Sequence, residues 1–565
     1  MQELKINLNL ITCLFFFLVA FLIYFNSLNN SFILDDNFLI AKNAYIKNIS
    51  LIPHLFKTDI FYFRSRDLSA ANLYYRPLQE LSYATDYYFW RLNPLGYRLT
   101  NILLHSLNSF VLFLLIGLIF KDKLLALLSA ILFCIHPIQV SLVAYITGRG
   151  QLLETFFMLL SLFCAASYFI HQKRHYYILS LLLFVCALFS REGALLLPIL
   201  VIICALFLNI DKRRAIVYSL PYVLIGISYL VLRSRFMPCS KCAFLNTLSL
   251  KNIYGFFWLT QEYLAQLILP AGLRTLFVGN AILMGKVLLF LSFATTLYCL
   301  IKAAVFRKKV FAFGILLYFI GLIPAANLID HIGYFGTILC EHYLYLASAG
   351  LFIIAAYLLI RLSHHLNKAA KACIAACFLF YICLTIINNT NYKDEITFYN
   401  HILNVDKEHS FVRVNLGNAY YTNKMYDKAI EQAKLTLALE PDSWDAYLLL
   451  ENVFKAKGDI TRAIGFYRKT IAFNPVSVEG YLALGITLAE SDYNKEAETV
   501  LREALIRFPD SVDIMRNLGA LYGNTGKLEE AVKIWQQALV LSPEDRILKN
   551  NIRLAKELLK KKASK

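Results

Sequence analysis

The chain has 565 residues, of which 58% are hydrophobic, and its mean hydropathy is +0.55. This composition excludes a single soluble domain, because apolar runs long enough to cross roughly 30 Å of hydrocarbon recur up to residue 388. Residues 1–388 carry 31 Lys and Arg against 14 Asp and Glu, whereas residues 389–565 carry 25 against 24. The net charge of +18 therefore belongs almost entirely to the membrane part. This distribution excludes a nucleic-acid-binding domain with a basic soluble face and fits an anionic lipid ligand.

Eleven membrane spans are predicted from the apolar runs. The first is too long for a signal-peptide core and is interpreted as a retained anchor. With the N-terminus inside, the Lys and Arg clusters of all the short loops face the cytoplasm, as the positive-inside rule requires. The apolar segment 254–270 contains Gln261 and Glu262 and is interpreted as an interfacial or re-entrant helix. The predicted spans are about 8–28, 99–119, 124–144, 151–170, 176–190, 194–210, 215–232, 282–302, 310–325, 344–362 and 370–388.

The odd number of spans places the C-terminal part outside the cytoplasm. That compartment is the periplasm of a bacterium, with the repeats outside the inner membrane, or alternatively the lumen of the endoplasmic reticulum. In this topology 11 of the 14 carboxylates of residues 1–388 lie on or near the outer face. Chemistry that needs a carboxylate is therefore expected there.

The first outer loop, at about residues 29–98, opens with Asp35 and Asp36 side by side. An ionised pair at a membrane surface is costly and points to a functional site. The alternative is that the pair caps a short helix at residues 37–40. Further polar motifs follow at outer helix ends: Tyr74-Tyr-Arg-Pro-Leu78, Asn101 with His105, His136-Pro137, Gly148-Arg149-Gly150, Ser190-Arg191-Glu192-Gly193 and Glu341-His342-Tyr-Leu-Tyr345.

Residues 410–543 repeat with a period of 34, and a proline marks each repeat end, at Pro441, Pro475, Pro509 and Pro543. The pattern resembles four tetratricopeptide repeats, which stack as a helical solenoid with a concave groove for a peptide. Residues 389–409 are a linker, and residues 544–565 are a capping helix with a basic tail. Three asparagines on the inner helices are candidates for holding a peptide backbone, or else solvated polar residues: Asn415, Asn418 and Asn517.

The ordered set of motifs, together with the repeats, resembles the transmembrane and tetratricopeptide-repeat O-mannosyltransferase-like proteins, including bacterial relatives. The resemblance implies an all-α chain: a multi-pass helical domain of the GT-C glycosyltransferase type over residues 1–388, followed by the solenoid. Three positions depart from the family pattern. Gln151 replaces an acidic residue, His342 replaces an arginine, and Ala347 replaces a proline.

The resemblance implies transfer of a sugar from a polyprenyl phosphate to a hydroxyl of a protein acceptor that binds partly through the repeats. Asp35, or Asp36 beside it, is the expected catalytic base. The expected cations for the donor phosphate are Arg76, Arg149, Arg191 and His342. Supporting roles are expected for Glu192, Glu341, His105 and His136, the two histidines alternatively being hydrogen-bonded packing residues. No metal-ligand spacing is present, so no cofactor is expected, the alternative being a divalent metal held by His and Asp side chains.

Two other functions compete with the enzyme. One is a membrane-anchored repeat scaffold without catalysis, motivated by the three departures. The other is a lipid or sugar transporter, although no inverted repeat is evident in the sequence. Cys239 and Cys242 lie in a polar stretch, where they are able to pair on an oxidising side, but a lone C-x-x-C is a weak redox signal.

Overall fold

The computed structural model divides into two compact units, residues 1–398 and 399–565, which are described separately. The described residues are 2–60, 74–236, 260, 263–268, 270, 277–278, 309–325, 338–339, 341–363, 365 and 367–563. Cys239, Cys242, most of segment 254–270 and the expected span 282–302 lie outside this part of the chain.

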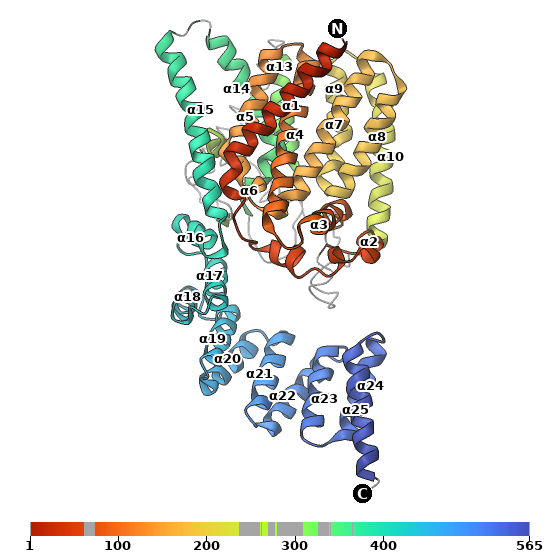
Figure 1. Cartoon of the computed structure of the whole chain (residues 1–565), viewed down its shortest axis with the longest axis vertical. Coiled ribbons are helices and arrows are strands. Elements are labelled where there is room, and N and C mark those ends of the chain that lie inside the picture. The colour runs from red at the N-terminus through yellow and green to blue at the C-terminus, as the bar shows by residue number, and fades with distance from the viewer. Residues whose placement is uncertain are drawn as a thin grey trace. The chain divides into compact units, whose positions relative to one another are not determined.

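The first unit is a bundle of long apolar helices, in agreement with the expected all-α class (Figure 1). Helix α7 packs on α8 and α4, and α13 packs on α14. The long helices are α1 (Gln2–Tyr24), α4 (Pro94–Phe120), α5 (Lys123–Ile135), α7 (Arg149–His171), α8 (Arg174–Ser190), α9 (Leu197–Phe207), α10 (Lys212–Phe236), α13 (Lys309–Leu322), α14 (Leu344–Ser363) and α15 (Lys368–Asn389).

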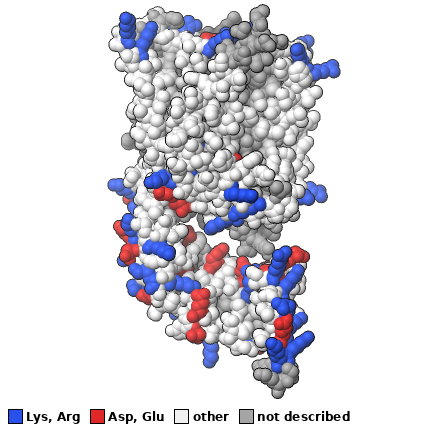
Figure 2. Space-filling view, viewed as in Figure 1, with Lys and Arg blue, Asp and Glu red and all other residues white. Residues whose placement is uncertain are grey.

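Successive helices alternate in direction, so the loops gather at two ends of the bundle (Figure 1). The short basic loops, such as 121–123 and 208–212, lie at the end that also holds the N-terminus. The expected site residues belong to the opposite end. Between the ends, the visible face is almost free of charged side chains (Figure 2). The interior holds a large apolar cluster that includes Leu112, Phe133 and Leu159.

Six helices of the described residues are long and apolar enough to cross a membrane. A seventh candidate is α5 joined to the four-residue α6 (Val140–Val143), and three shorter apolar helices add to these. Every expected span within the described residues coincides with one of these helices, and the count of eleven stays a prediction. Span 124–144, expected to be continuous, is bent by 53° next to Pro137, which lacks the N–H needed to continue the helix.

Short helices cover the end of the bundle that holds the expected site. The longest, α3 (Pro77–Trp90), lies across this end and contacts α4 and α8 (Figure 1). The others are α2 (Ile52–Leu55), the π-helix η2 (Asn37–Ala41) and the 3-10 helices η1 (Phe25–Ser27), η3 (Tyr45–Lys47), η4 (Ile49–Leu51), η5 (Pro137–Gln139), η6 (Ile146–Gly148), η7 (Glu192–Leu196), η8 (Ile323–Ala325), η9 (Glu341–Tyr343) and η10 (Thr390–Tyr392). Two-residue strands, β1 (Phe277–Val278) and β2 (Ile338–Leu339), pair antiparallel.

The second unit is a solenoid of helix pairs with a capping helix, as the 34-residue period predicts. The repeat alanines, including Ala429 and Ala463, are fully buried where the two helices of a repeat meet. Helix α16 (Glu395–Val405) leads into the array. The pairs are α17 (Ser410–Thr422) with α18 (Tyr426–Leu439), α19 (Trp444–Ala456) with α20 (Ile460–Phe473), α21 (Val478–Glu490) with α22 (Asn494–Arg507) and α23 (Val512–Asn524) with α24 (Leu528–Leu541), followed by the cap α25 (Arg546–Ala563).

Candidate functional site

The two adjacent aspartates have different surroundings. Asp36 is fully buried, and both of its carboxylate oxygens accept hydrogen bonds. Its Oδ1 accepts from the N–H of Thr147 at 2.9 Å and from the Thr147 hydroxyl at 2.6 Å, and its Oδ2 accepts from the N–H of Ile33 at 3.2 Å. Asp35 is partly exposed, and its backbone N–H donates to the Tyr145 hydroxyl at 3.3 Å. Asp36 therefore ties the loop to the turn at residue 147, and Asp35 is the more accessible of the two carboxylates.

Asp36 precedes η2 but makes no side-chain cap hydrogen bond to it. Burial raises the pKa of Asp36 from 3.8 to about 6, although the hydrogen bonds from Thr147 and the charge of Arg98 oppose this shift. Asp36 thus changes its charge within the range of pH in which an enzyme is assayed.

The backbone just before the pair is strained. Leu34 has φ of 50°, in the left-handed region that a leucine rarely adopts. Its N–H donates to Glu395 Oε1 at 3.3 Å, and Asn37 Nδ2 donates to the same oxygen at 2.9 Å. Strained residues persist where the surroundings over-determine them, often at functional sites.

The turn that receives Asp36 is fixed from helix α4. Asn101 Nδ2 donates to the carbonyl oxygens of Leu142 and Tyr145 at 3.2 and 3.1 Å. Arg98, fully buried, donates to the carbonyl oxygens of Ala144, Asn30 and Ser31. Arg98 thereby joins the loop that carries the aspartates to the turn that binds them.

Arg149 belongs to this framework rather than to an open surface. Its Nη2 lies 2.8 Å from Asp86 Oδ2 of α3 and donates to the carbonyl oxygen of Tyr97 at 2.6 Å, and its Nε donates to Asn101 Oδ1. Both charged side chains are buried, with 0% and 8% exposed. Arg149 is thus already paired and surrounded by protein.

Helix α3 links the aspartates to a second group of charges. Near its start, Gln79 Nε2 donates to the carbonyl oxygen of Thr147 at 3.2 Å. A Cβ on Gly150 would lie 2.3 Å from Gln79 Oε1, so the Gln79 amide lies directly against the backbone at Gly150. Arg76, one helical turn before Gln79, forms an ion pair with Glu192 at 2.8 Å. The aspartate framework and the Arg76 pair are therefore about one helical turn apart on α3.

Three of the four expected cations come together around this ion pair. Arg191 donates to the Oε1 of Gln151 and lies over the Tyr343 ring at 5.5 Å. Burial and the nearby charges of Arg191 and Arg76 lower the pKa of His342, so its imidazole is neutral. We define Arg76, Arg191 and His342 as the cation cluster. At position 342, where the family pattern has an arginine, an imidazole thus lies beside two guanidinium groups.

A carboxylate that the sequence reasoning did not select lies in the same place. Glu154 of α7 is 6% exposed, and its Oε1 has no hydrogen-bond partner among the described residues. Its charge interacts with those of Arg191, Arg76 and Glu192. Glu154 lies one helical turn after Gln151 on the same helix face, and this spacing is the feature by which the sequence could have identified it. Glu341, which the sequence did predict, is 2% exposed, and its Oε1 likewise has no partner in the described part.

The two histidines are interior packing residues. His105 Nδ1 lies 2.7 Å from the Tyr345 hydroxyl, and Nε2 lies 3.0 Å from the carbonyl oxygen of Cys134. His136 ends α5, with Nε2 3.1 Å from the carbonyl oxygen of Leu267. Both are fully buried and make these contacts.

In the repeats, Asn415 and Asn517 each donate to the backbone carbonyl four residues earlier, at 3.0 and 2.8 Å. Both are partly exposed, and Asn418 is exposed. A peptide would therefore compete with an internal hydrogen bond at two of the three positions. Among the described residues, no group of three or more His, Cys, Asp or Glu side chains is arranged to hold a metal ion.

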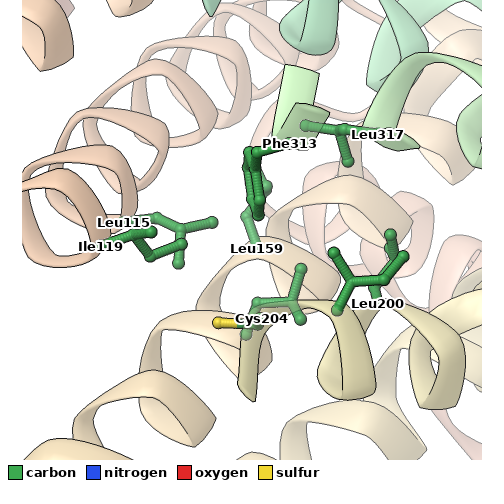
Figure 3. Close-up of a pocket in the computed structure, with 9 residues that line it drawn as sticks. Leu115, Ile119, Leu159, Leu200, Cys204, Phe313 and Leu317 are labelled. Carbon is green, nitrogen blue, oxygen red and sulfur yellow. The ribbon is translucent and has the colours of Figure 1, made fainter. Parts of the chain in front are cut away.

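A small apolar pocket lies inside the bundle (Figure 3). Leu115, Leu159, Leu200, Cys204 and Phe313 from four helices line it. None of the expected site residues contributes to its wall.

Two family models match this chain. Residues 91–237 match the dolichyl-phosphate-mannose-protein mannosyltransferase model, and residues 482–546 match the tetratricopeptide repeat model. The first stretch contains the turn at residue 147, Arg149, Glu154 and Arg191.

Curated relatives extend the similarity over most of the chain. The protein O-mannosyl-transferase F38B6.6 of Caenorhabditis elegans is 27% identical over 74% of this chain and 61% of its own. The protein O-mannosyl-transferase TMTC3 of Mus musculus is 23% identical over 76% of this chain and 51% of its own. The resemblance predicted from the motifs is confirmed. The matched region spans between half and two thirds of these relatives.

Among solved structures, the tetratricopeptide protein YrrB, titled as having an unusual peptide-binding site, is similar to 31% of this chain and 87% of its own. Its identity is 21% and its TM-score is 0.25. The MamA protein is 24% identical, with a TM-score of 0.24, over 26% of this chain and 81% of its own.

Proposed function

We propose that the chain is a membrane glycosyltransferase of the GT-C type. It moves a sugar, a mannose-like hexose, from a polyprenyl phosphate to a hydroxyl of a protein acceptor. The observation that carries the proposal is the partly exposed Asp35, held beside a turn that α3 connects to the cation cluster. Base and phosphate-binding groups are thus contributed by one end of the bundle.

The roles follow from the geometry. Asp35 takes the proton of the acceptor hydroxyl, because its side chain is partly exposed whereas Asp36 is buried and bonded to Thr147 and Ile33. Arg76 and Arg191 stabilise the leaving polyprenyl phosphate, for which a guanidinium fork is well suited. His342 adds a neutral imidazole beside them, because burial and the two arginines lower its pKa. The attack displaces the phosphate in one step, so the sugar carbon is inverted. The two guanidinium groups supply the charge that the leaving group needs, and the proposal includes no metal.

The remaining expected residues act indirectly. Glu192 orients Arg76, and Arg149 holds the turn through Asp86. The solenoid binds the acceptor protein, and Asn418 is the peptide-binding candidate with the most accessible side chain. We place the site and the repeats on the non-cytoplasmic side of a bacterial inner membrane, because the basic short loops gather at the opposite end of the bundle.

The test is transfer by the full-length protein reconstituted in nanodiscs. Polyprenyl-phosphate mannose carrying a radiolabelled sugar is the donor, and envelope proteins of an expression host that lacks the gene are the acceptor. Asp35→Asn is expected to lower transfer by about 100-fold or more, the range of a lost general base. Asp122→Asn, the same chemical change at the opposite bundle end, is the matched control, since Asn also caps α5.

Undiminished transfer by Asp35→Asn would remove Asp35 from catalysis. No transfer by the wild-type protein, together with retained capture of envelope proteins, would favour the scaffold without catalysis.

A further inference from the structure

Of the two arginines in the cation cluster, one has a carboxylate as its hydrogen-bond partner and the other has a neutral amide. Arg76 has Glu192 as its partner, at 2.8 Å. Arg191 donates to Gln151, which is neutral. Among the described residues, Glu154 and Glu341 each keep one carboxylate oxygen without a hydrogen-bond partner, and the charge of Glu154 is the one that interacts with Arg191 and Arg76. A buried carboxylate without full hydrogen bonding is costly, so this arrangement requires an explanation.

Glu154 lies against the turn that carries Arg191 and Glu192. A Cβ on Gly193 would lie 2.5 Å from Glu154 Oε1, so the carboxylate sits directly on the backbone at Gly193. The N–H of Ala194 faces the same carboxylate. Gln151, one turn earlier on α7, binds Arg191 itself. Gln151 and Glu154, one helical turn apart on α7, therefore contact Arg191, Gly193 and Ala194 of the loop at residues 191–194.

We infer that Glu154 is a positioning residue of the donor site, and that its carboxylate is the counter-charge of Arg191 and Arg76 until a phosphate binds there. This inference rests on the proposed function and names the group that sets the affinity for the polyprenyl phosphate. The negative charge of Glu154 keeps the two guanidinium groups in place when the site is empty. It also repels the phosphate product, which must leave after each transfer.

The charge and the packing of Glu154 have opposite kinetic consequences. Glu154→Gln keeps the shape and an acceptor oxygen for Ala194 but removes the charge. At a buried site of reduced dielectric constant, one missing negative charge strengthens phosphate binding considerably. If product release limits turnover, tighter binding of the product lowers kcat as well as KM. If Glu154 contributed only packing, Glu154→Gln would instead raise KM.

Binding of polyprenyl phosphate to the full-length protein in nanodiscs at low salt is the direct measurement. Glu154→Gln is expected to lower the Kd for polyprenyl phosphate about tenfold, and to lower both KM for polyprenyl-phosphate mannose and kcat. Gln151→Glu adds a carboxylate directly at Arg191 and is expected to raise Kd about tenfold. The double variant Gln151→Glu/Glu154→Gln moves the charge by one turn and is expected to bind within a few-fold of wild type.

Glu529→Gln, an exposed change of the same kind on α24, is the control for total charge. Thermal unfolding midpoints accompany each variant, and the double variant still tests the charge if Glu154→Gln alone folds poorly. An unchanged or higher Kd in folded Glu154→Gln would overturn the inference while leaving transfer by the wild type, and the proposed function, intact. Failure of the wild type to bind polyprenyl phosphate and to transfer sugar would overturn both.

Discussion

The two units of the chain use charged side chains differently. In the membrane unit, Arg149 and Asp86 form an ion pair with 0% and 8% of their side chains exposed. In the solenoid, Lys457 and Asp427 form a pair at a similar distance, 2.9 Å, with 39% and 92% exposed. The distance is therefore a poor guide to what each pair contributes.

The two ion pairs differ in how much hydration their charged groups lose on folding. A buried charge that loses its partner remains desolvated and uncompensated, whereas an exposed one regains water. The membrane unit consequently depends on each member of its polar framework. The solenoid obtains its stability from apolar packing between helices, such as Ala463 and Leu484 in its interior.

The sharpest test of this comparison is Arg149→Met. The change leaves Asp86 buried without its cation and is expected to cost about 3–5 kcal/mol. The thermal midpoint of the full-length protein in detergent should fall accordingly. Adding Asp86→Leu should recover much of the loss, because no unpaired charge then remains. An unchanged midpoint in the single variant would show that the pair contributes nothing to folding.

A second test uses the exception in the solenoid, Glu451. It is fully buried at a position where other repeats have glycine, and one oxygen accepts from the Thr470 hydroxyl at 3.2 Å. Burial raises its pKa from 4.5 to about 9, although the Thr470 hydrogen bond opposes the shift. The folded protein therefore keeps Glu451 protonated. The contribution of Glu451 to the free energy of unfolding is most favourable below pH 4.5 and declines as the pH rises towards about 9.

Between pH 6 and pH 8, this residue should lower the stability of its repeat by about 2–3 kcal/mol. Hydrogen exchange of α19 and α20, corrected for the intrinsic effect of pH, measures the decline. Glu451→Gln should abolish it, and Glu529→Gln should not. A decline of equal size in Glu451→Gln would assign the effect to another group.

A third test uses the titration of Asp36 in the membrane unit. Because its pKa lies at about 6 in the folded protein, protonation below that pH weakens its hydrogen bonds from Thr147. Transfer should therefore fall on the acid side of about pH 6, by up to about tenfold per pH unit. The pH profile of kcat/KM measures this. In Asp36→Asn the residual activity should lack that step, and a persistent step would point to Asp35.

The smallest effect is expected for Lys457→Ala. Removing this exposed pair should change stability by less than about 1 kcal/mol. Hydrogen exchange of α18 and α19 measures the change in the full-length protein. A loss comparable to that of Arg149→Met would break the comparison between the units.

The sequence predicted the architecture because its signals are periodic. Apolar runs locate the helices of the bundle, and Pro441 and its equivalents locate the repeats. Asp35 and Asp36 were recognisable because an acidic pair after a membrane span is rare. The bend at Pro137 was also available from the sequence, since proline removes a helical hydrogen bond.

The division of labour within the site was not predictable. Asp86 lies 63 residues before Arg149, and only the fold shows that this arginine is paired inside the protein. Thr147 and Gln79 carry no charge, so nothing in the sequence marks them as the link between Asp36 and the cation cluster. Glu154 was hidden because Gln151 occupies the position at which an acid was sought.

The left-handed leucine at position 34 has a consequence for protein engineering. An L-residue in this conformation stores about 1–2 kcal/mol, which Leu34→Gly would release. Selection for heat resistance would therefore favour glycine there. A glycine at position 34 would make this segment more flexible and hold Asp35 less firmly. Variants selected for heat resistance would therefore have a lower turnover.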